Sequence, residues 1–306
     1  MYLLNFAIGD AYGSGFEFIK KPFPFKNNLT EFYQNPNSKK DGSIFTPAGW
    51  FTDDTEMTLA IAETLLENNL SSIKKENFIE KFLELFQTEK RPGYASGFYN
   101  FLLTVKDVDD FKSRIISTSD RNGAMMRTSP LGYIKNITDL LKLTEMQASI
   151  THNTFSSILS AKIISLLYHY TIYNLGKKSD CISFIKESLY DNYKFRSDIH
   201  PNIQDDFFNN IKPLSGKISL NGFKASLNIL DIFMSNNNEK DLLLDVIERT
   251  GDTDTGASLS LGLATLSNEY EHNLPNNLIE RFKNTEPQID RLIKINKAIL
   301  HIGLIE

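Results

Sequence analysis

Apolar residues recur at steps of three and four along most of this chain. The spacing holds over residues 57–65 and again over 78–86. It places apolar side chains on one face of an α-helix, so both stretches are predicted to be helical. The same reasoning predicts further helices over 155–168, 222–234, 239–248, 255–267 and 277–300.

Strictly alternating apolar and polar residues, the pattern of a half-buried strand, are scarce. Two stretches, 20–50 and 191–221, are rich in polar residues and proline and are predicted to be irregular. No change of composition marks a domain boundary, and no solenoid repeat is visible. We therefore expect one all-α domain that spans residues 1–306.

Composition narrows the possible settings and partners. The 306 residues are 41% hydrophobic and 23% charged, the balance of a soluble globular protein. The net charge of −5 makes nucleic acid an unexpected partner, although a local basic patch stays possible. Cys181 is the single cysteine, so no intrachain disulfide can form, and the first residues do not resemble a signal peptide. The most apolar long stretch, 155–167, is interrupted by polar residues, so no membrane span is expected. We expect a cytoplasmic protein that is a monomer.

Two groups of oxygen-bearing side chains stand at the starts of predicted helices. One lies in "GWFTDDTEM" (49–57) and the other in "GDTDTGASL" (251–259). Helix capping explains one side-chain oxygen at each position, and Asp53 with Glu56 fits a capping box. Capping does not explain why each group offers two carboxylates together with a threonine hydroxyl.

If these two helix starts face each other, four carboxylates converge in a partly buried place. Their repulsion would raise their pKa values unless a cation neutralised them. Mg²⁺ prefers oxygen ligands, and four carboxylates with two hydroxyls are enough for a pair of such ions. No Cys or His lies near either group in the sequence, which disfavours zinc and iron–sulfur centres.

The second group has two other possible interpretations. An EF-hand loop counted from Asp252 needs Gly at its sixth position and Glu at its twelfth, where this chain has Ala257 and Leu263. A phosphatase loop of the haloacid-dehalogenase type follows a buried strand near the N-terminus, whereas this group lies late in the chain after a predicted helix. The EF-hand is excluded, and a metal-dependent phosphatase stays as a weaker alternative.

Five separated blocks together resemble the ADP-ribosylglycohydrolase family, which includes dinitrogenase-reductase-activating glycohydrolases and animal ADP-ribosylhydrolases. The blocks occur in order over nearly the whole chain: "AIGDAYGSGFE" (7–17), "FTDDTEMTLAIAETLL" (51–66), "NGAMMRTSPLGY" (122–133), "SITHNTFSS" (149–157) and "GDTDTGASLSLGLA" (251–264). The segment "TLSNEYEHNLP" after the last block lacks the glycine-rich continuation common in relatives. The resemblance therefore does not specify the rim of the cleft or the substrate that it admits.

The resemblance implies an orthogonal helical bundle with two Mg²⁺ ions, or Mn²⁺, at the bottom of a cleft for ADP-ribose. The implied metal ligands are Thr52, Asp53, Asp54, Asp252, Asp254 and Thr255. Glu17, Asp53 and Asp254 are the implied catalytic residues, with Glu17 beside the distal ribose and outside the tight metal shell. The implied ligand-binding residues are Tyr94, Asn122, Gly123 and His152.

Each of these assignments has a structural alternative. Glu17 can be a solvated acid at the end of the first helix, and His152 a helix cap or packed residue. Gly123 can present helix amides to a pyrophosphate, while Arg127 can pair with a core carboxylate. Tyr94 is at least as readily a core aromatic residue.

The function implied by the resemblance is metal-dependent hydrolysis of the glycosidic bond between ADP-ribose and an acceptor. ADP-ribosyl-arginine on protein is the preferred substrate, so the expected partners are ADP-ribose and ADP-ribosylated protein. The other possibility is a non-catalytic ADP-ribose-binding immunity or regulatory protein. The intact set of carboxylates favours catalysis over binding alone.

Overall fold

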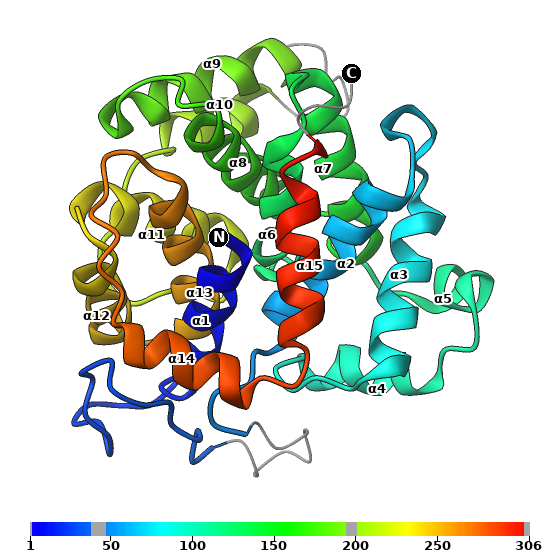
Figure 1. Cartoon of the computed structure of the whole chain (residues 1–306). Helices are drawn as coiled ribbons and strands as arrows, with labels where there is room; N and C mark the ends of the chain where they lie inside the picture. Colours follow the sequence, from blue (N-terminus) through cyan, green and yellow to red (C-terminus); the bar gives the residue numbers. More distant parts are fainter. Residues whose placement is uncertain (1, 38–46, 194–200, 303–306) are drawn as a thin grey trace.

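The computed structural model describes residues 2–37, 47–193 and 201–302 (Figure 1). These ranges consist of helices and loops, with isolated β-bridges and no strand. The all-α class predicted from the spacing of apolar residues is therefore confirmed for the described residues.

The α-helices have the following bounds in chain order: α1 (Tyr2–Ser14), α2 (Asp53–Glu67), α3 (Lys75–Thr88), α4 (Ser96–Thr104), α5 (Val108–Arg114), α6 (Gly123–Met126), α7 (Ile137–Thr151), α8 (Phe155–Ile172), α9 (Cys181–Tyr193), α10 (Pro201–Asn209), α11 (Gly222–Ser235), α12 (Glu239–Arg249), α13 (Thr253–Leu266), α14 (Asn276–Thr285) and α15 (Ile289–Ile299). Three short 3-10 helices complete the set: η1 (Leu70–Ser72), η2 (Ser129–Tyr133) and η3 (Lys178–Asp180).

Most helices predicted from periodicity are present, but two predictions are corrected. The stretch 277–300 is two helices, α14 and α15, because Pro287 disfavours a helical conformation at Glu286. The stretch 191–221 includes α10, so it is not wholly irregular, and residues 194–200 lie outside the described residues. Residues 20–37 and 47–50 are non-helical, as predicted, and 38–46 lie outside the described ranges.

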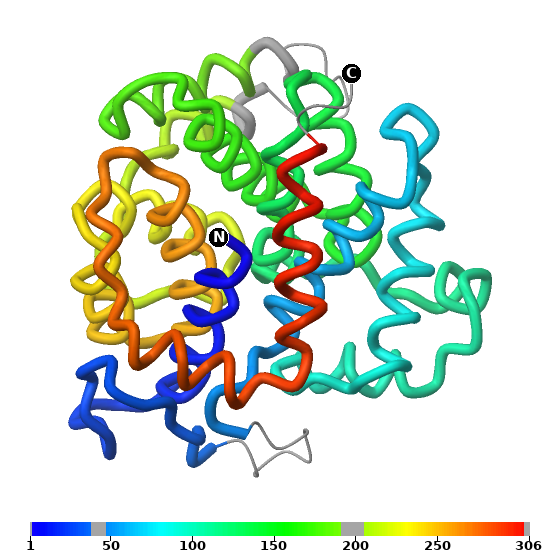
Figure 2. Tube along the Cα trace, in the orientation of Figure 1, coloured from blue at the N-terminus to red at the C-terminus, as the bar shows by residue number. Residues whose placement is uncertain are grey.

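Helix α1 lies at the centre of the molecule, between α13 and α15 (Figures 1 and 2). Every residue of α1 except Asn5 is buried, and a helix that is apolar on all sides is stable only when surrounded. Because Gly13 has no side chain, α1 packs closely on α13 at this position. The Thr253 hydroxyl donates a hydrogen bond to the Gly13 carbonyl at 2.8 Å. Two sequence-distant helices thus form the core on which the site is built.

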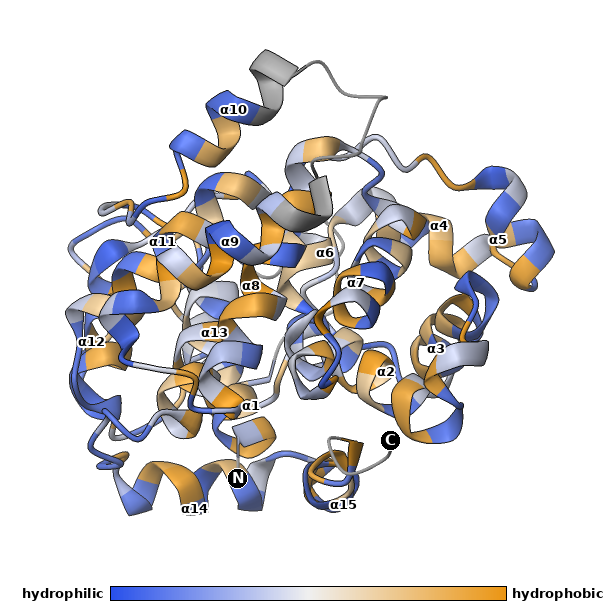
Figure 3. Cartoon of the chain, turned by 90° about the horizontal axis from the view of Figure 1, so that it is seen from above, coloured by the Kyte–Doolittle hydropathy of each residue, from blue (hydrophilic) through white to orange (hydrophobic). Residues whose placement is uncertain are grey.

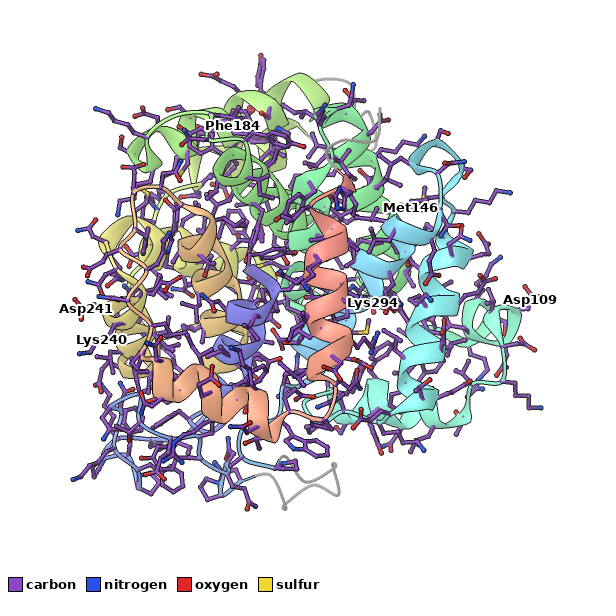
Figure 4. The ribbon with its side chains drawn as sticks, in the orientation of Figure 1. Asp109, Met146, Phe184, Lys240, Asp241 and Lys294 are labelled. Atoms are coloured by element: carbon purple, nitrogen blue, oxygen red, sulfur yellow. The ribbon has the colours of Figure 1, made fainter. Side chains whose placement is uncertain are left out.

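The outer helices present polar residues to solvent. Figure 3 shows apolar and polar stretches alternating along α14 at the edge of the molecule. Charged side chains such as Asp109, Lys240 and Asp241 lie at the periphery in Figure 4 and are exposed. Within the described residues, no helix has both the length and the apolar character needed to span a membrane.

Candidate functional site

A cavity of about 870 Å³ opens beside the N-terminal ends of α2 and α13. Its volume falls in the range of pockets that hold small-molecule ligands. The cavity wall includes all the site residues predicted from the sequence: Glu17, Thr52, Asp53, Asp54, Tyr94, Asn122, Gly123, His152, Asp252, Asp254 and Thr255. The fold thus brings together residues separated by up to 238 positions, from Glu17 to Thr255.

The start of α2 is held by a buried aspartate of α1. The Asp10 carboxylate accepts hydrogen bonds from the backbone N–H and the hydroxyl of both Thr52 and Thr55, at 2.6–3.0 Å. The Thr52 hydroxyl in turn accepts a longer bond from the Asp54 N–H at 3.4 Å, as an N-cap does. Both threonine hydroxyls therefore donate to Asp10, which fixes the orientation of the first turn that carries Asp53 and Asp54.

Two hydrogen bonds orient the aspartates at the start of α13. Asn122 donates from its side-chain amide to Asp252 Oδ2 at 2.8 Å, and the Thr255 N–H donates to Asp254 Oδ1 at 2.9 Å. Ser258 joins the two helix starts, since its hydroxyl lies 3.5 Å from Asp54 Oδ1. Asn122, predicted as a ligand-binding residue, here orients a carboxylate.

Glu17 belongs to the same group of acids. One carboxylate oxygen of Glu17, Asp252 and Asp254 each lies within 4.8 Å of the other two, which makes these residues a candidate metal site. Asn35 holds the turn that carries Glu17, because its amide donates to the carbonyls of Ser14 and Glu17, both at 2.9 Å. Glu17 is therefore close enough to the two aspartates to share a cation with them, and its place outside the metal shell stays a prediction.

Burial and mutual repulsion perturb the aspartates. Burial raises the pKa of Asp53 well above its usual value, and the charges of Asp10 and Asp252 raise it further. Burial also raises the pKa of Asp54, with Asp10 and Asp53 adding to it. The pKa of Asp254 is raised by burial first and then by Glu17 and Asp252.

These carboxylates fit a divalent cation. Within the described ranges, no Lys or Arg forms an ion pair with Asp53, Asp54, Asp252 or Asp254, although all four are buried. Buried carboxylates without a paired cation are costly unless they coordinate a metal. Hard oxygen donors such as these suit Mg²⁺ or Mn²⁺ rather than softer metals.

A tight turn presses against Asp53 from the side of α4. The Pro92 carbonyl accepts from the Asp53 N–H at 2.9 Å. Gly93 follows with φ +103°, and a Cβ at this position would lie 2.1 Å from Asp53 Oδ1. Only glycine combines this backbone conformation with such a close approach to the carboxylate.

Tyr94 serves both the core and the cavity wall. Its ring packs edge-on against Phe86 at 5.5 Å between centroids and lies 6.1 Å from Phe98. The side chain is 5% exposed, and its hydroxyl is buried without a hydrogen-bond partner among the described residues. Both interpretations of Tyr94 are therefore compatible with its position.

His152 ends α7 beside the glycine that begins α6. Its Nδ1 lies 2.7 Å from the Thr151 hydroxyl, and a Cβ on Gly123 would lie 2.9 Å from the imidazole Cε1. Burial and the nearby Arg127 charge lower the pKa of His152 to about 3, so the ring is neutral near pH 7. His152 is thus both the C-cap of α7 and part of the cavity wall.

Arg127 does not form the ion pair with a core carboxylate that the sequence left open. Its guanidinium donates to the side chain and backbone carbonyl of Gln147 and to the Thr151 hydroxyl. It also lies 4.6 Å from the centre of the Phe82 ring. Burial lowers the pKa of Arg127 to about 9, even though the nearby Tyr94 and Asp53 act to raise it.

Two of the backbone amides after Gly123 are not free to bind a pyrophosphate. Helix α6 is only four residues long. The N–H groups of Met125 and Met126 already donate to the Asn122 carbonyl, at 2.8 and 3.0 Å. A pyrophosphate could therefore not use these two amides without breaking the turn.

Asp10 and Asn35 are the positioning residues that sequence reasoning missed. Asp10 is the only charged residue in α1, and a single charge in a mostly apolar, almost fully buried helix is a usable signal. Asn35 lies in an irregular segment without periodicity, and nothing in the local sequence identifies its two carbonyl partners.

Comparisons with known proteins agree with this geometry. The family model described as ADP-ribosylglycohydrolase matches residues 2–302. An uncharacterized protein of Archaeoglobus fulgidus is 27% identical over 172 residues, which cover 54% of this chain and about half (52%) of that protein. A solved structure described as "ADP-ribosylglycohydrolase-related protein complex" has 19% identity and a TM-score of 0.70, with 99% of this chain and 96% of that chain covered. This structure shares the fold.

Proposed function

Because the chain belongs to the ADP-ribosylglycohydrolase family, we propose that it is a metal-dependent hydrolase of the glycosidic bond between ADP-ribose and an acceptor. The preferred acceptor is an arginine side chain of a protein, and the enzyme acts as a monomer. The observation that carries the proposal is the convergence of Glu17, Asp252 and Asp254 within 4.8 Å on the wall of one ligand-sized cavity.

The residues proposed to hold two Mg²⁺ or Mn²⁺ ions are Thr52, Asp53, Asp54, Asp252, Asp254 and Thr255. When bound, these ions supply positive charge beside the ribose hydroxyls and lower the pKa of nearby water. The hydrogen bonds of Asp10 and Asn122 orient the carboxylates before the substrate arrives. Preorganised ligands spare the site a rearrangement during the reaction.

The protein's own carboxylates would also act on the sugar. Cleavage at the anomeric carbon develops positive charge in an oxocarbenium-like transition state, which neighbouring carboxylates stabilise. We assign proton transfer to Glu17, Asp53 or Asp254, since a general acid or base must reach the reacting atoms. Glu17 is the first choice because it lies partly buried in the wall, in a turn fixed by Asn35.

Another group of cavity residues suits the ADP portion of the ligand. The aromatic residues Tyr94, Phe98 and Phe101 line the cavity together with Arg114 and Arg121. Aromatic rings can stack on adenine, and arginine is a frequent partner of phosphate. His152 and Gly123 line the same cavity.

The test is release of free ADP-ribose from arginine-ADP-ribosylated protein, measured with Mg²⁺ and with EDTA. Wild type should release ADP-ribose only with metal, and Asp254→Asn should lose turnover at least about 100-fold, as expected for a group acting in the transition state. Asp241→Asn is the matched control, since Asp241 is an exposed aspartate of α12 (Figure 4).

Full metal-dependent activity of Asp254→Asn would contradict the proposed site. Tight calorimetric binding of ADP-ribose by the wild type without release from arginine, serine or base conjugates would instead identify a binding protein. Release of inorganic phosphate in place of ADP-ribose would identify a phosphatase.

A further inference from the structure

A second, smaller hollow adjoins the candidate site. It has a volume of about 310 Å³ and shares one residue, Phe18, with the large cavity. Gly251, in its wall, directly precedes Asp252 in the chain. We call it the lysine hollow, because three lysines are among its lining residues. The full lining is Phe18, Ile19, Lys20, Lys21, Lys217, Thr250 and Gly251.

Phe18 forms the boundary between the two cavities. It follows Glu17 and has φ +54°, a left-handed conformation that costs a non-glycine residue free energy. Its N–H donates to the Gly251 carbonyl at 2.9 Å, which holds the strained turn. The ring is nevertheless 44% exposed. A strained, exposed aromatic residue beside a candidate catalytic acid indicates a functional constraint.

The charged groups differ on the two sides of this boundary. The large cavity is lined by five carboxylates and three arginines, whereas the hollow is lined by three lysines and no acid. Lys21 is paired with Glu248 at 2.6 Å, but neither Lys20 nor Lys217 forms an ion pair with any described residue. The Lys217 side chain lies along the backbone at Gly251, where a Cβ would be 2.9 Å from its Cγ. Two lysines without an ion pair thus line a hollow that meets the candidate site at Phe18.

The residues that line the two cavities suggest the path by which the acceptor leaves. If the ADP portion contacts Tyr94 and Arg121 and the distal ribose lies at the acids, we take the acceptor to leave past Glu17, which directly precedes Phe18. The acceptor then passes the exposed ring of Phe18, and an aromatic face attracts a guanidinium group. The residues next to that arginine in the target lie over the lysine hollow.

We propose that the lysine hollow binds acidic side chains next to the ADP-ribosylated arginine of the target protein. This inference rests on the proposed function and adds a sequence preference to it. Lys20 and Lys217 would pair with target carboxylates, and Phe18 would contact the arginine. A protein segment fits better than a nucleic acid strand because the patch is short and the whole chain carries a net charge of −5.

The experiment compares three substrates: free ADP-ribosyl-arginine, a peptide with ADP-ribosyl-arginine between aspartates, and the same peptide with asparagines in their place. Wild type should have a kcat/KM about tenfold higher for the acidic peptide, the size expected of two exposed ion pairs. The preference should shrink in 0.5 M salt, which screens exposed charges.

Charge reversal identifies the residues. Lys20→Glu/Lys217→Glu should abolish the preference, with a larger loss on the acidic peptide than on free ADP-ribosyl-arginine. Lys240→Glu is the matched control, because Lys240 is an exposed lysine of α12 away from both cavities (Figure 4). It should leave all three rates at the wild-type level.

Equal rates for the two peptides, or a preference that persists in the double variant, would overturn the inference and leave the proposed function intact. A lysine-dependent preference for an ADP-ribosylated oligonucleotide would overturn it in favour of a nucleic acid acceptor. Failure of the wild type to cleave even free ADP-ribosyl-arginine would overturn the proposed function and this inference with it.

Discussion

Arg91 and Glu286 form a bidentate ion pair, at 2.6 and 3.1 Å, that solvent does not reach from either side. The same carboxylate accepts from the N–H groups of Phe51 and Gln288. The Arg91 guanidinium also lies 3.9 Å from the centre of the Phe51 ring. The pair therefore ties the junction of α14 and α15 to two segments next to Asp53: the residues before α2, through Phe51, and the turn before α4, through Arg91.

Removal of one partner of this pair should be severely destabilising. Glu286→Ala removes the buried partner of the Arg91 guanidinium and leaves only its longer pair with the part-exposed Glu89, at 3.2 Å. We expect the free energy of unfolding to fall by up to about 3–5 kcal/mol. Urea denaturation measures the change. Glu280→Ala is the control, since its pair with Lys283 is exposed and should contribute little. A loss below about 1 kcal/mol for Glu286→Ala would show that the pair is not structurally important.

Asp10→Ala should destabilise the metal-bound protein more than the metal-free protein. The substitution leaves the donors of Thr52 and Thr55 without an acceptor, at about 1–3 kcal/mol for each buried group. In the metal-free protein it also removes a charge that repels Asp53 and Asp54, which offsets part of the loss. Thermal unfolding in Mg²⁺ and in EDTA measures both values. Asp109→Ala, at an exposed position of α5, should change neither, and equal losses in both buffers for Asp10→Ala would refute the explanation.

Gly13→Ala should disrupt the contact between α1 and α13. The added Cβ would lie 2.3 Å from the Thr253 carbonyl oxygen, which is backbone and cannot rotate away. We expect a loss of about 1–3 kcal/mol or more, the usual cost of overpacking. Gly97→Ala in α4 is the control, because its Cβ meets no atom within 4 Å and should stabilise the helix by up to about 1 kcal/mol. Denaturation midpoints for the two variants should move in opposite directions.

Metal removal should lower thermal stability. A ligand that binds only the folded state at 100 times its Kd stabilises it by about 2.7 kcal/mol, so Mg²⁺ or Mn²⁺ should raise the unfolding temperature of the wild type above its value in EDTA. Asp252→Asn should lose most of this increase, and Asp241→Asn should keep it. If the two variants respond alike to metal, the acids near Glu17 do not hold the ion.

The single thiol should be unreactive in the folded protein. Cys181 is fully buried, and burial raises its pKa to about 12, so almost no thiolate exists at pH 8. Because thiolate is the reactive species, a disulfide reagent should label Cys181 only when urea unfolds the chain. The rate of labelling is followed by absorbance at a series of urea concentrations. Rapid labelling in native buffer would mean that α9 opens locally.

Sequence reasoning was most successful where the signal was local. The spacing around Met57 and Phe82 predicted α2 and α3 correctly, because these helices each bury one apolar face. The two acidic motifs were predicted to precede helices, and α2 and α13 begin at Asp53 and Thr253. Their ligand roles stay a prediction that the metal experiments test.

The errors have identifiable causes. The single helix predicted over 277–300 ignored Pro287, whose effect on Glu286 is local and visible in the sequence. The role of Asp10 depends on two threonines 42 and 45 residues away, and that of Asn35 on backbone carbonyls. Such partners are set by tertiary packing, which periodicity does not encode.

The pairing of α1 with α13 has a consequence for synthesis on the ribosome. Gly13 and Thr253 are 240 residues apart, so α1 emerges long before its partner exists. At the usual rates of translation this interval is on the order of 10–50 s. Throughout it, the face of α1 that packs on α13 in the folded protein stays uncovered. We therefore expect chaperones to bind the nascent chain until α13 has left the exit tunnel.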